Sequence, residues 1–105
     1  MRSLFLPIVV VTAAMFAYSP FYIADVPYES TMLLVQKIFY YHFPTWIAGA
    51  VAVIACGAAS AWFLFKGSKT ADHVAVACAE LGVIFGAFGL ISGTLWGRKA
   101  WGTWW

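Results

Sequence analysis

Charged residues are scarce in this 105-residue chain. Only 10% of its residues are charged, with six Lys or Arg against four Asp or Glu, while 64% are hydrophobic. So few charges cannot form the surface of a water-soluble domain of this size. The basic residues are scattered and form no patch, so nothing indicates a nucleic-acid partner. The composition favours a protein whose solvent is the lipid bilayer.

Cysteine is also scarce. Cys56 and Cys78 both fall inside apolar runs, at depths that differ by several Å at about 1.5 Å per residue, so we expect no disulfide between them. A buried cysteine of this kind behaves as a small apolar residue. The chain has no Cys-x-x-Cys-His motif, which excludes covalent heme attachment as in mature c-type cytochromes. It shows no internal repeat or low-complexity linker, and we predict one domain over residues 1–105.

Long apolar runs are abundant instead. They cover Leu4–Ala24, Phe43–Phe65 and His73–Leu95. Each is long enough to cross a bilayer, which takes about 20 apolar residues in a helix. The runs are continuous and do not alternate with period two, so helices are favoured over a barrel. We therefore predict an all-α, polytopic membrane protein with three transmembrane helices. The first run is too long for a signal peptide and has no small-x-small cleavage site, so we expect it to remain.

Basic residues give limited information about orientation. They divide three against three between the two faces: Arg2, Lys66 and Lys69 against Lys37, Arg98 and Lys99. Since the first helix usually dominates orientation, the leading Arg2 predicts a cytoplasmic N-terminus. The segments before Phe43 and after Leu95 are separated by two crossings, so they must emerge on the same, outer face.

The first outer segment, Asp25–Trp46, is longer than a simple turn. Ser30 can cap a helix there. An apolar stripe then follows with helical spacing: Leu34, Ile38 and Tyr41. This pattern predicts a short amphipathic helix at the membrane interface. Pro44 suits the start of the next helix, where its missing N–H costs nothing, and this places His42 at the outer mouth of the second span.

The two histidines differ in what their surroundings indicate. A lone histidine among aromatic residues, such as His42, is more often a hydrogen-bonding interfacial residue than a ligand, and the residues alone leave both interpretations open. His73 lies at the opposite end of the third span, where a role at the start of the helix explains it. By the crossing argument, His73 cannot share a site with His42.

The second outer segment is rich in tryptophan. Four of its ten residues are Trp: Trp96, Trp101, Trp104 and Trp105. An aromatic belt at the headgroup level is the simplest interpretation. However, belts rarely concentrate so many indoles in one loop with Gly97 and Gly102 between them. Such a loop offers a flat apolar shelf with several N–H donors, which would suit a planar, largely apolar ligand that carries carboxylates.

The third span carries four glycines on one side, which predicts close packing against the small-faced second span: Gly82, Gly86, Gly89 and Gly93. Glu80 is the one acid within a span, and ionisable groups there usually face protein or a wet cavity. We expect it to be protonated and bonded to Ser60 or to the Trp62 indole. A proton-relay role is the alternative.

Several segments together resemble a known family. They are Lys37-Ile-Phe-Tyr-Tyr-His42-Phe-Pro, Ala71-Asp-His-Val-Ala-Val-Ala-Cys-Ala-Glu80-Leu-Gly, Ser92-Gly-Thr-Leu-Trp-Gly97 and Trp101-Gly-Thr-Trp-Trp105. They resemble successive segments of the cytochrome c maturation C family (CcmC, heme exporter protein C). The most specific is the tryptophan-rich WWD motif, whose family form is close to Trp-Gly-x-Trp-Trp-x-Trp-Asp. The sequence stops inside this motif, so the resemblance implies the N-terminal half of a longer six-span protein.

The resemblance implies a function and a site. Such a protein is not an enzyme: it holds heme b non-covalently at the outer face of the bacterial inner membrane and passes it to a heme chaperone. Its partners would be that chaperone, a small membrane subunit and an ATP-binding cassette complex. By motif match, His42 is the first axial ligand of the heme iron, while the family's second ligand histidine belongs to a later loop that this sequence lacks. The tryptophans would contact heme: Trp96, Trp101, Trp104 and Trp105. Arg98 and Lys99 are candidates to pair with the propionates.

Two alternatives remain open. A related heme lyase of the WWD superfamily would join heme to apocytochrome thiols, but lyases carry the motif after a longer series of spans than the three present here. The other alternative is a structural or nonfunctional membrane fragment.

Overall fold

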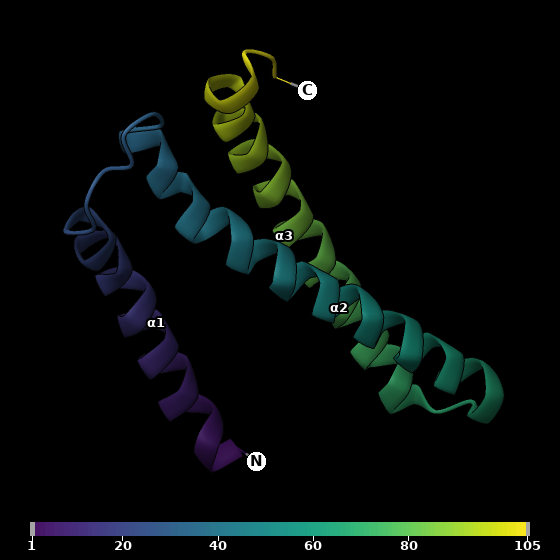
Figure 1. Ribbon diagram of the computed structural model, residues 1–105. Helices are drawn as coiled ribbons and strands as arrows, with labels where there is room; N and C mark the ends of the chain where they lie inside the picture. Colours follow the sequence, from purple (N-terminus) through teal and green to yellow (C-terminus); the bar gives the residue numbers. More distant parts are fainter. Residues whose placement is uncertain (1, 105) are drawn as a thin grey trace.

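The computed structural model describes residues 2–104, with Arg2 described only through its backbone. Its elements are α1 (Arg2–Ala24), the 3-10 helix η1 (Leu34–Ile38), α2 (Phe39–Lys66) and α3 (Lys69–Trp101) (Figure 1). The three α-helices are each long and apolar enough to cross a membrane. Within residues 2–104 the only extended pairing is an isolated bridge between Glu29 and Leu33. The prediction of an all-α protein with three spans is confirmed.

The helices α2 and α3 are both longer than the apolar runs that predicted them. Because α2 already begins at Phe39, Pro44 is its sixth residue, and the prediction that Pro44 starts the helix was wrong. The reason is that η1 runs directly into α2: the N–H of Phe39 donates to the carbonyls of Gln36 and Lys37. The first turn of α2 is therefore organised before Pro44, whose missing N–H removes only a single helical hydrogen bond.

The connection between α1 and η1 is organised around the carboxylate of Glu29. Its Oε2 accepts hydrogen bonds from the Thr31 hydroxyl (2.6 Å), the Met32 N–H (2.6 Å) and the Thr31 N–H (2.9 Å). These bonds, that from the Thr31 hydroxyl foremost, lower the pKa of Glu29 to about 2. Ser30 caps no helix but donates to Glu29 Oε1. The expected cap was therefore wrong, because Glu29 organises the turn, and the short helix that follows is a 3-10 helix of five residues.

Small residues bring α2 and α3 together. Ala52 of α2 and Ala75 of α3 are buried between them, and a Cβ added at Gly49 would lie 3.3 Å from the Cβ of Phe85. Small side chains allow two helices to approach closely where lipid supplies no hydrophobic driving force. The two helices are joined by a turn in which Gly67 has a φ of 65° and the Ser68 hydroxyl accepts a bond from the N–H of Ala71.

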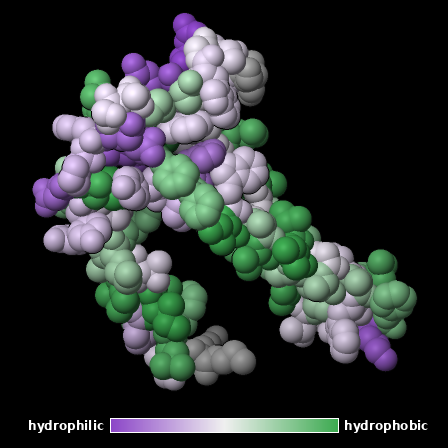
Figure 2. Space-filling model, viewed as in Figure 1, coloured by the Kyte–Doolittle hydropathy of each residue, from purple (hydrophilic) through white to green (hydrophobic). Residues whose placement is uncertain are grey.

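The first helix meets the α2–α3 pair mainly near its C-terminal end. The Tyr41 hydroxyl lies 3.2 Å from Ser19 Oγ, the ring of Phe16 packs edge-on against Tyr41, and Lys37 Nζ donates to the Ala24 carbonyl at 2.5 Å. Away from these contacts, α1 diverges from the pair toward its N-terminus (Figure 1). Hydrophilic side chains gather around the connecting segment at this end, while the helices below are largely hydrophobic (Figure 2). Polar residues therefore cover the end of the molecule where η1 and the C-terminus of α3 lie, and apolar helices extend below it (Figure 2).

Candidate functional site

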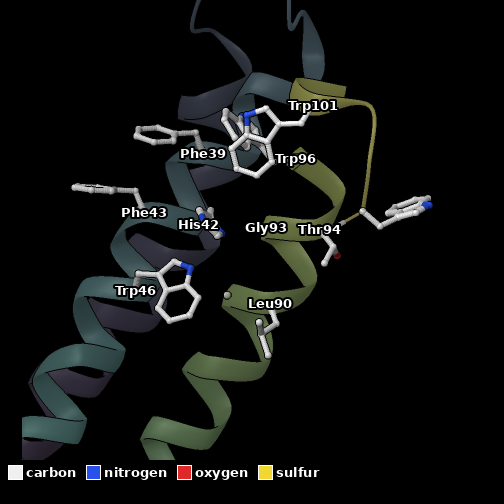
Figure 3. Close-up of a pocket in the computed structure, with 11 residues that line it drawn as sticks. Phe39, His42, Phe43, Trp46, Leu90, Gly93, Thr94, Trp96 and Trp101 are labelled. Atoms are coloured by element: carbon white, nitrogen blue, oxygen red, sulfur yellow. The ribbon is translucent and has the colours of Figure 1, made fainter. Parts of the chain in front are cut away.

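A cavity of about 500 Å³ lies between the start of α2 and the end of α3. From α2 it is lined by Phe39, His42, Phe43 and Trp46, and from the C-terminal part of the chain by Gly89, Leu90, Gly93, Thr94, Trp96, Trp101 and Trp104. Figure 3 shows several of these side chains turned toward the space between the two helices. Small-molecule sites commonly have this size and a mainly apolar, aromatic wall with a few polar groups. The cavity therefore has the character of a ligand site.

His42 is held on three sides. Its Nδ1 lies 2.9 Å from Ser92 Oγ, and its ring packs edge-on against Trp46 with 6.2 Å between ring centroids. On the α3 side the ring touches Gly93, where an added Cβ would lie only 2.8 Å from His42 Cε1. No hydrogen bond within the described residues involves Nε2. The imidazole is thus fixed in position with one ring nitrogen left for a ligand.

The tryptophan-rich segment differs from the predicted loop, because α3 continues through it to Trp101. The helix ends at Gly102, which has a φ of 75°. Gly97 permits the last turn to fold tightly, since a Cβ there would lie 3.3 Å from the Trp101 ring. The predicted loop was wrong because Arg98 and Lys99 are favourable in the last turn of a helix, where cations interact with the helix dipole.

The indoles form the outer wall of the cavity. Trp96 and Trp101 pack edge to face with 5.3 Å between ring centroids. Trp96 Nε1 donates to Gln36 Oε1 at 3.4 Å, which ties the end of α3 to η1. Trp101 is 70% exposed and Trp104 is half exposed, so both offer free aromatic surface. Trp105, which we also expected to contact a ligand, lies outside the described residues.

The basic residues lie at the rim and do not line the cavity. Arg98 donates a hydrogen bond to the Gly102 carbonyl, and its guanidinium lies 5.5 Å from the centroid of the Trp104 ring. It therefore orders the segment that follows α3. Lys99 is exposed at the same end of the helix.

Two titratable residues lie away from this site. His73 is near the start of α3, sixteen residues before Gly89, the first residue of α3 that lines the cavity, which places it about 24 Å from the cavity along the helix. Glu80 is exposed on α3, and within residues 2–104 it forms no hydrogen bond with Ser60 or Trp62. The expected contact of Glu80 was therefore wrong, since its side chain lies outside the surface that α3 buries against α2. Among the same described residues, no group of three or more His, Cys, Asp or Glu converges to hold a metal ion.

Comparison with known proteins assigns the chain to a family. A family model described as heme exporter protein C matches residues 1–105. The chain belongs to the heme exporter protein C family. Curated relatives of that name include those of Haemophilus influenzae, 37% identical over 71 residues, and of Escherichia coli K12 and Shigella flexneri, both 34% identical over 73 residues. Each alignment covers 66% of this chain and 28% of the relative. No solved protein structure matches the chain at a significant level.

In this member of the heme exporter protein C family, sequence reasoning missed part of the cavity. It named His42 and the tryptophans but overlooked Phe39, Phe43 and Trp46, which line the cavity from α2. It also overlooked Gly93 and Ser92, which contact the imidazole from α3. A signal was present, because residues 39, 43 and 46 follow the i, i+4, i+7 pattern of one helix face with His42 between them. This pattern was missed because the helix was expected to begin at Pro44, which leaves residues 39 and 43 outside it.

Proposed function

We propose that this chain binds heme b non-covalently at the outer, periplasmic face of the bacterial inner membrane and presents it to the heme chaperone of cytochrome c maturation. The observation that carries the proposal is the His42 imidazole, held at the wall of an aromatic cavity with Nε2 free of hydrogen bonds within the described residues. Membership of the heme exporter protein C family supports the choice of ligand. The role is delivery of a cargo, and the chain is not an enzyme.

The residues of the cavity fit the chemistry of heme. Heme is a flat, largely apolar macrocycle whose iron accepts an imidazole nitrogen, and its surroundings tune the iron through polarity and hydrogen bonding. His42 would supply the axial nitrogen. The indoles of Trp96, Trp101 and Trp104 would cover the macrocycle, and Trp105, outside the described residues, remains a further candidate to contact heme. Such aromatic contacts contribute about 0.5–1.5 kcal/mol each beyond the burial of their area.

The rim suits the heme carboxylates. Arg98 uses only part of its hydrogen-bonding capacity on the Gly102 carbonyl, and a guanidinium has five N–H donors. Lys99, in the next position of the last turn, adds a second cation. We propose that these two residues pair with the propionates, where charge-assisted hydrogen bonds are stronger than neutral ones.

The proposed setting is a multi-pass protein with a cytoplasmic N-terminus. The small membrane subunit and the ATP-binding cassette complex of the same pathway would be its partners within the bilayer. The alignments cover 28% of the length of the relatives, and we propose that this chain supplies the first three spans of such a longer, six-span protein. The second axial histidine would then come from a later outer segment. In its absence the sixth position of the iron would be left to water or a weak donor.

Heme titration of the purified chain in detergent or nanodiscs tests the proposal. We expect a Soret band typical of five-coordinate or mixed coordination, lost in His42→Ala because the iron then has no imidazole. His73→Ala is the matched control, since it removes the other histidine, about 24 Å from the cavity. Unchanged heme binding in His42→Ala would overturn the assignment and leave His42 as an interfacial hydrogen-bonding residue.

A further inference from the structure

We propose that Ser92 is a positioning residue that holds His42 in the tautomer with the proton on Nδ1, so that Nε2 is the nitrogen presented to a ligand. The inference deepens the proposed function and rests on it for the identity of the ligand. The tautomer itself is a property of this chain without heme, and it can be measured separately.

The first step is the hydrogen-bonding position of the Ser92 hydroxyl. Ser92 is buried, with 7% of its surface exposed. Its Oγ lies 2.7 Å from the carbonyl oxygen of Phe88, 3.2 Å from that of Gly89 and 2.9 Å from His42 Nδ1. A hydroxyl has a single proton to donate, and carbonyl oxygens can only accept. The short distance to Phe88 therefore assigns the Ser92 proton to that carbonyl, a usual arrangement for serine inside a helix.

The second step concerns which nitrogen of the His42 imidazole carries the hydrogen. With its proton directed to Phe88, Ser92 Oγ can only accept from His42, so Nδ1 must carry the hydrogen. The opposite tautomer would require the Ser92 proton to turn to Nδ1. Two acceptor oxygens, Ser92 Oγ and the Phe88 carbonyl oxygen, would then face each other at 2.7 Å with no proton between them, which is repulsive.

The third step concerns which side of the ring faces the ligand site. Ser92 does not line the aromatic cavity but a separate apolar cavity of about 220 Å³, beside Tyr41 and Phe88. His42 lines the aromatic cavity and not the smaller one. Because its Nδ1 is directed to Ser92, Nε2 is the nitrogen left for the aromatic cavity. Groups that hydrogen-bond the far nitrogen of a ligating histidine fix its tautomer and orientation and raise its basicity.

Nitrogen-15 NMR of the heme-free chain tests the tautomer directly. The chain has only two histidines, so His73→Gln leaves His42 as the single imidazole signal. At about pH 8.5, where imidazole is neutral, we expect Nδ1 to carry the proton. Ser92→Ala should shift the signal toward a mixture of tautomers, because no acceptor then faces Nδ1. Ser92→Thr keeps the hydroxyl, and the neighbouring cavity has room for its methyl group, so it should restore the original signal.

The measurement can fail in two recognisable ways. If Nε2 carries the proton while Ser92 is still in place, the assignment is overturned, and this result needs no variant at Ser92. An unchanged tautomer in Ser92→Ala, with helix content equal to that of the parent by circular dichroism, would show that Ser92 does not set it.

Heme binding gives an independent readout. Loss of a hydrogen-bonding partner behind a metal ligand typically lowers metal affinity about 10–100-fold, and we expect Ser92→Ala to fall in this range with Ser92→Thr close to the parent. The reduction potential of bound heme should rise in Ser92→Ala, because the imidazole becomes a weaker electron donor. If His42→Ala binds heme normally, the proposed function fails while the tautomer result stands. If heme needs His42 but is indifferent to Ser92→Ala, the positioning role fails alone.

Discussion

Gly93 and His42 touch across the interface between α3 and α2: a Cβ at position 93 would lie 2.8 Å from His42 Cε1. Real side chains do not approach so closely, so Gly93→Ala must displace the imidazole from its place beside Ser92. We expect this variant to lower heme affinity at least about tenfold, in the range seen when the support of a metal ligand is disturbed. The measurement is heme titration followed by the Soret band.

Gly86→Ala is the matched control in the same helix. A Cβ at Gly86 meets nothing within 4 Å, so this variant should bind heme like the parent. It should also be slightly more stable to heat, because alanine favours a helix over glycine by about 0.5–1 kcal/mol. Equal heme affinity for Gly93→Ala and Gly86→Ala would show that His42 is not used as a ligand.

The exposed indoles give a second prediction. If Trp101 and Trp104 cover the macrocycle, replacing both with alanine removes about 1 kcal/mol each and lowers heme affinity about 30-fold. Heme-induced quenching of their fluorescence should disappear as well. Trp62→Ala is the control, because Trp62 is comparably exposed near the opposite end of α2. Unchanged heme affinity in the double variant would favour a plain aromatic belt at the membrane surface.

Membrane topology gives a third prediction. After Cys56 and Cys78 are replaced by alanine, an impermeant thiol reagent applied from the periplasm should label Asp25→Cys and Lys99→Cys, because both exposed positions lie at the same end of the helices. Thr70→Cys, at the start of α3, should be labelled only after the membrane is opened. Labelling of Thr70→Cys alone from outside would invert the proposed orientation.

The turn at Glu29 gives a prediction about pH. The pKa of its carboxyl is lowered in the folded chain to about 2 from an ordinary value of 4.5, because hydrogen bonds from Thr31 and Met32 favour the ionised form. The carboxylate therefore stabilises the turn fully above pH 4.5, and this contribution is lost as the pH falls through about 2. The protection of the Thr31 and Met32 amides, measured as exchange relative to the intrinsic rate at each pH, should fall over this window. Glu29→Gln should remove the pH dependence, and an unchanged profile would assign the turn to other contacts.

Local patterns were enough to predict the three spans. A run of about 20 apolar residues and the thickness of a bilayer decide whether a segment crosses, and neither depends on what the segment packs against. The same patterns brought His42 and the tryptophan-rich segment to one face by counting crossings. They misplaced the helix ends, since hydropathy does not register the Glu29 turn that leads into η1, or the helical continuation through Gly97 to Trp101.

Tertiary structure decided which side chains meet at the site. The contact of His42 with Ser92 joins residues fifty positions apart, and that of Trp96 with Gln36 joins residues sixty apart. Such pairs depend on how far α2 and α3 slide and rotate against each other, which is set by the close approach of small residues along both helices. The sequence thus determined that one imidazole and several indoles lie at the same end of a helical hairpin. Only packing determined that Ser92 fixes one nitrogen of that imidazole and leaves the other to the aromatic cavity.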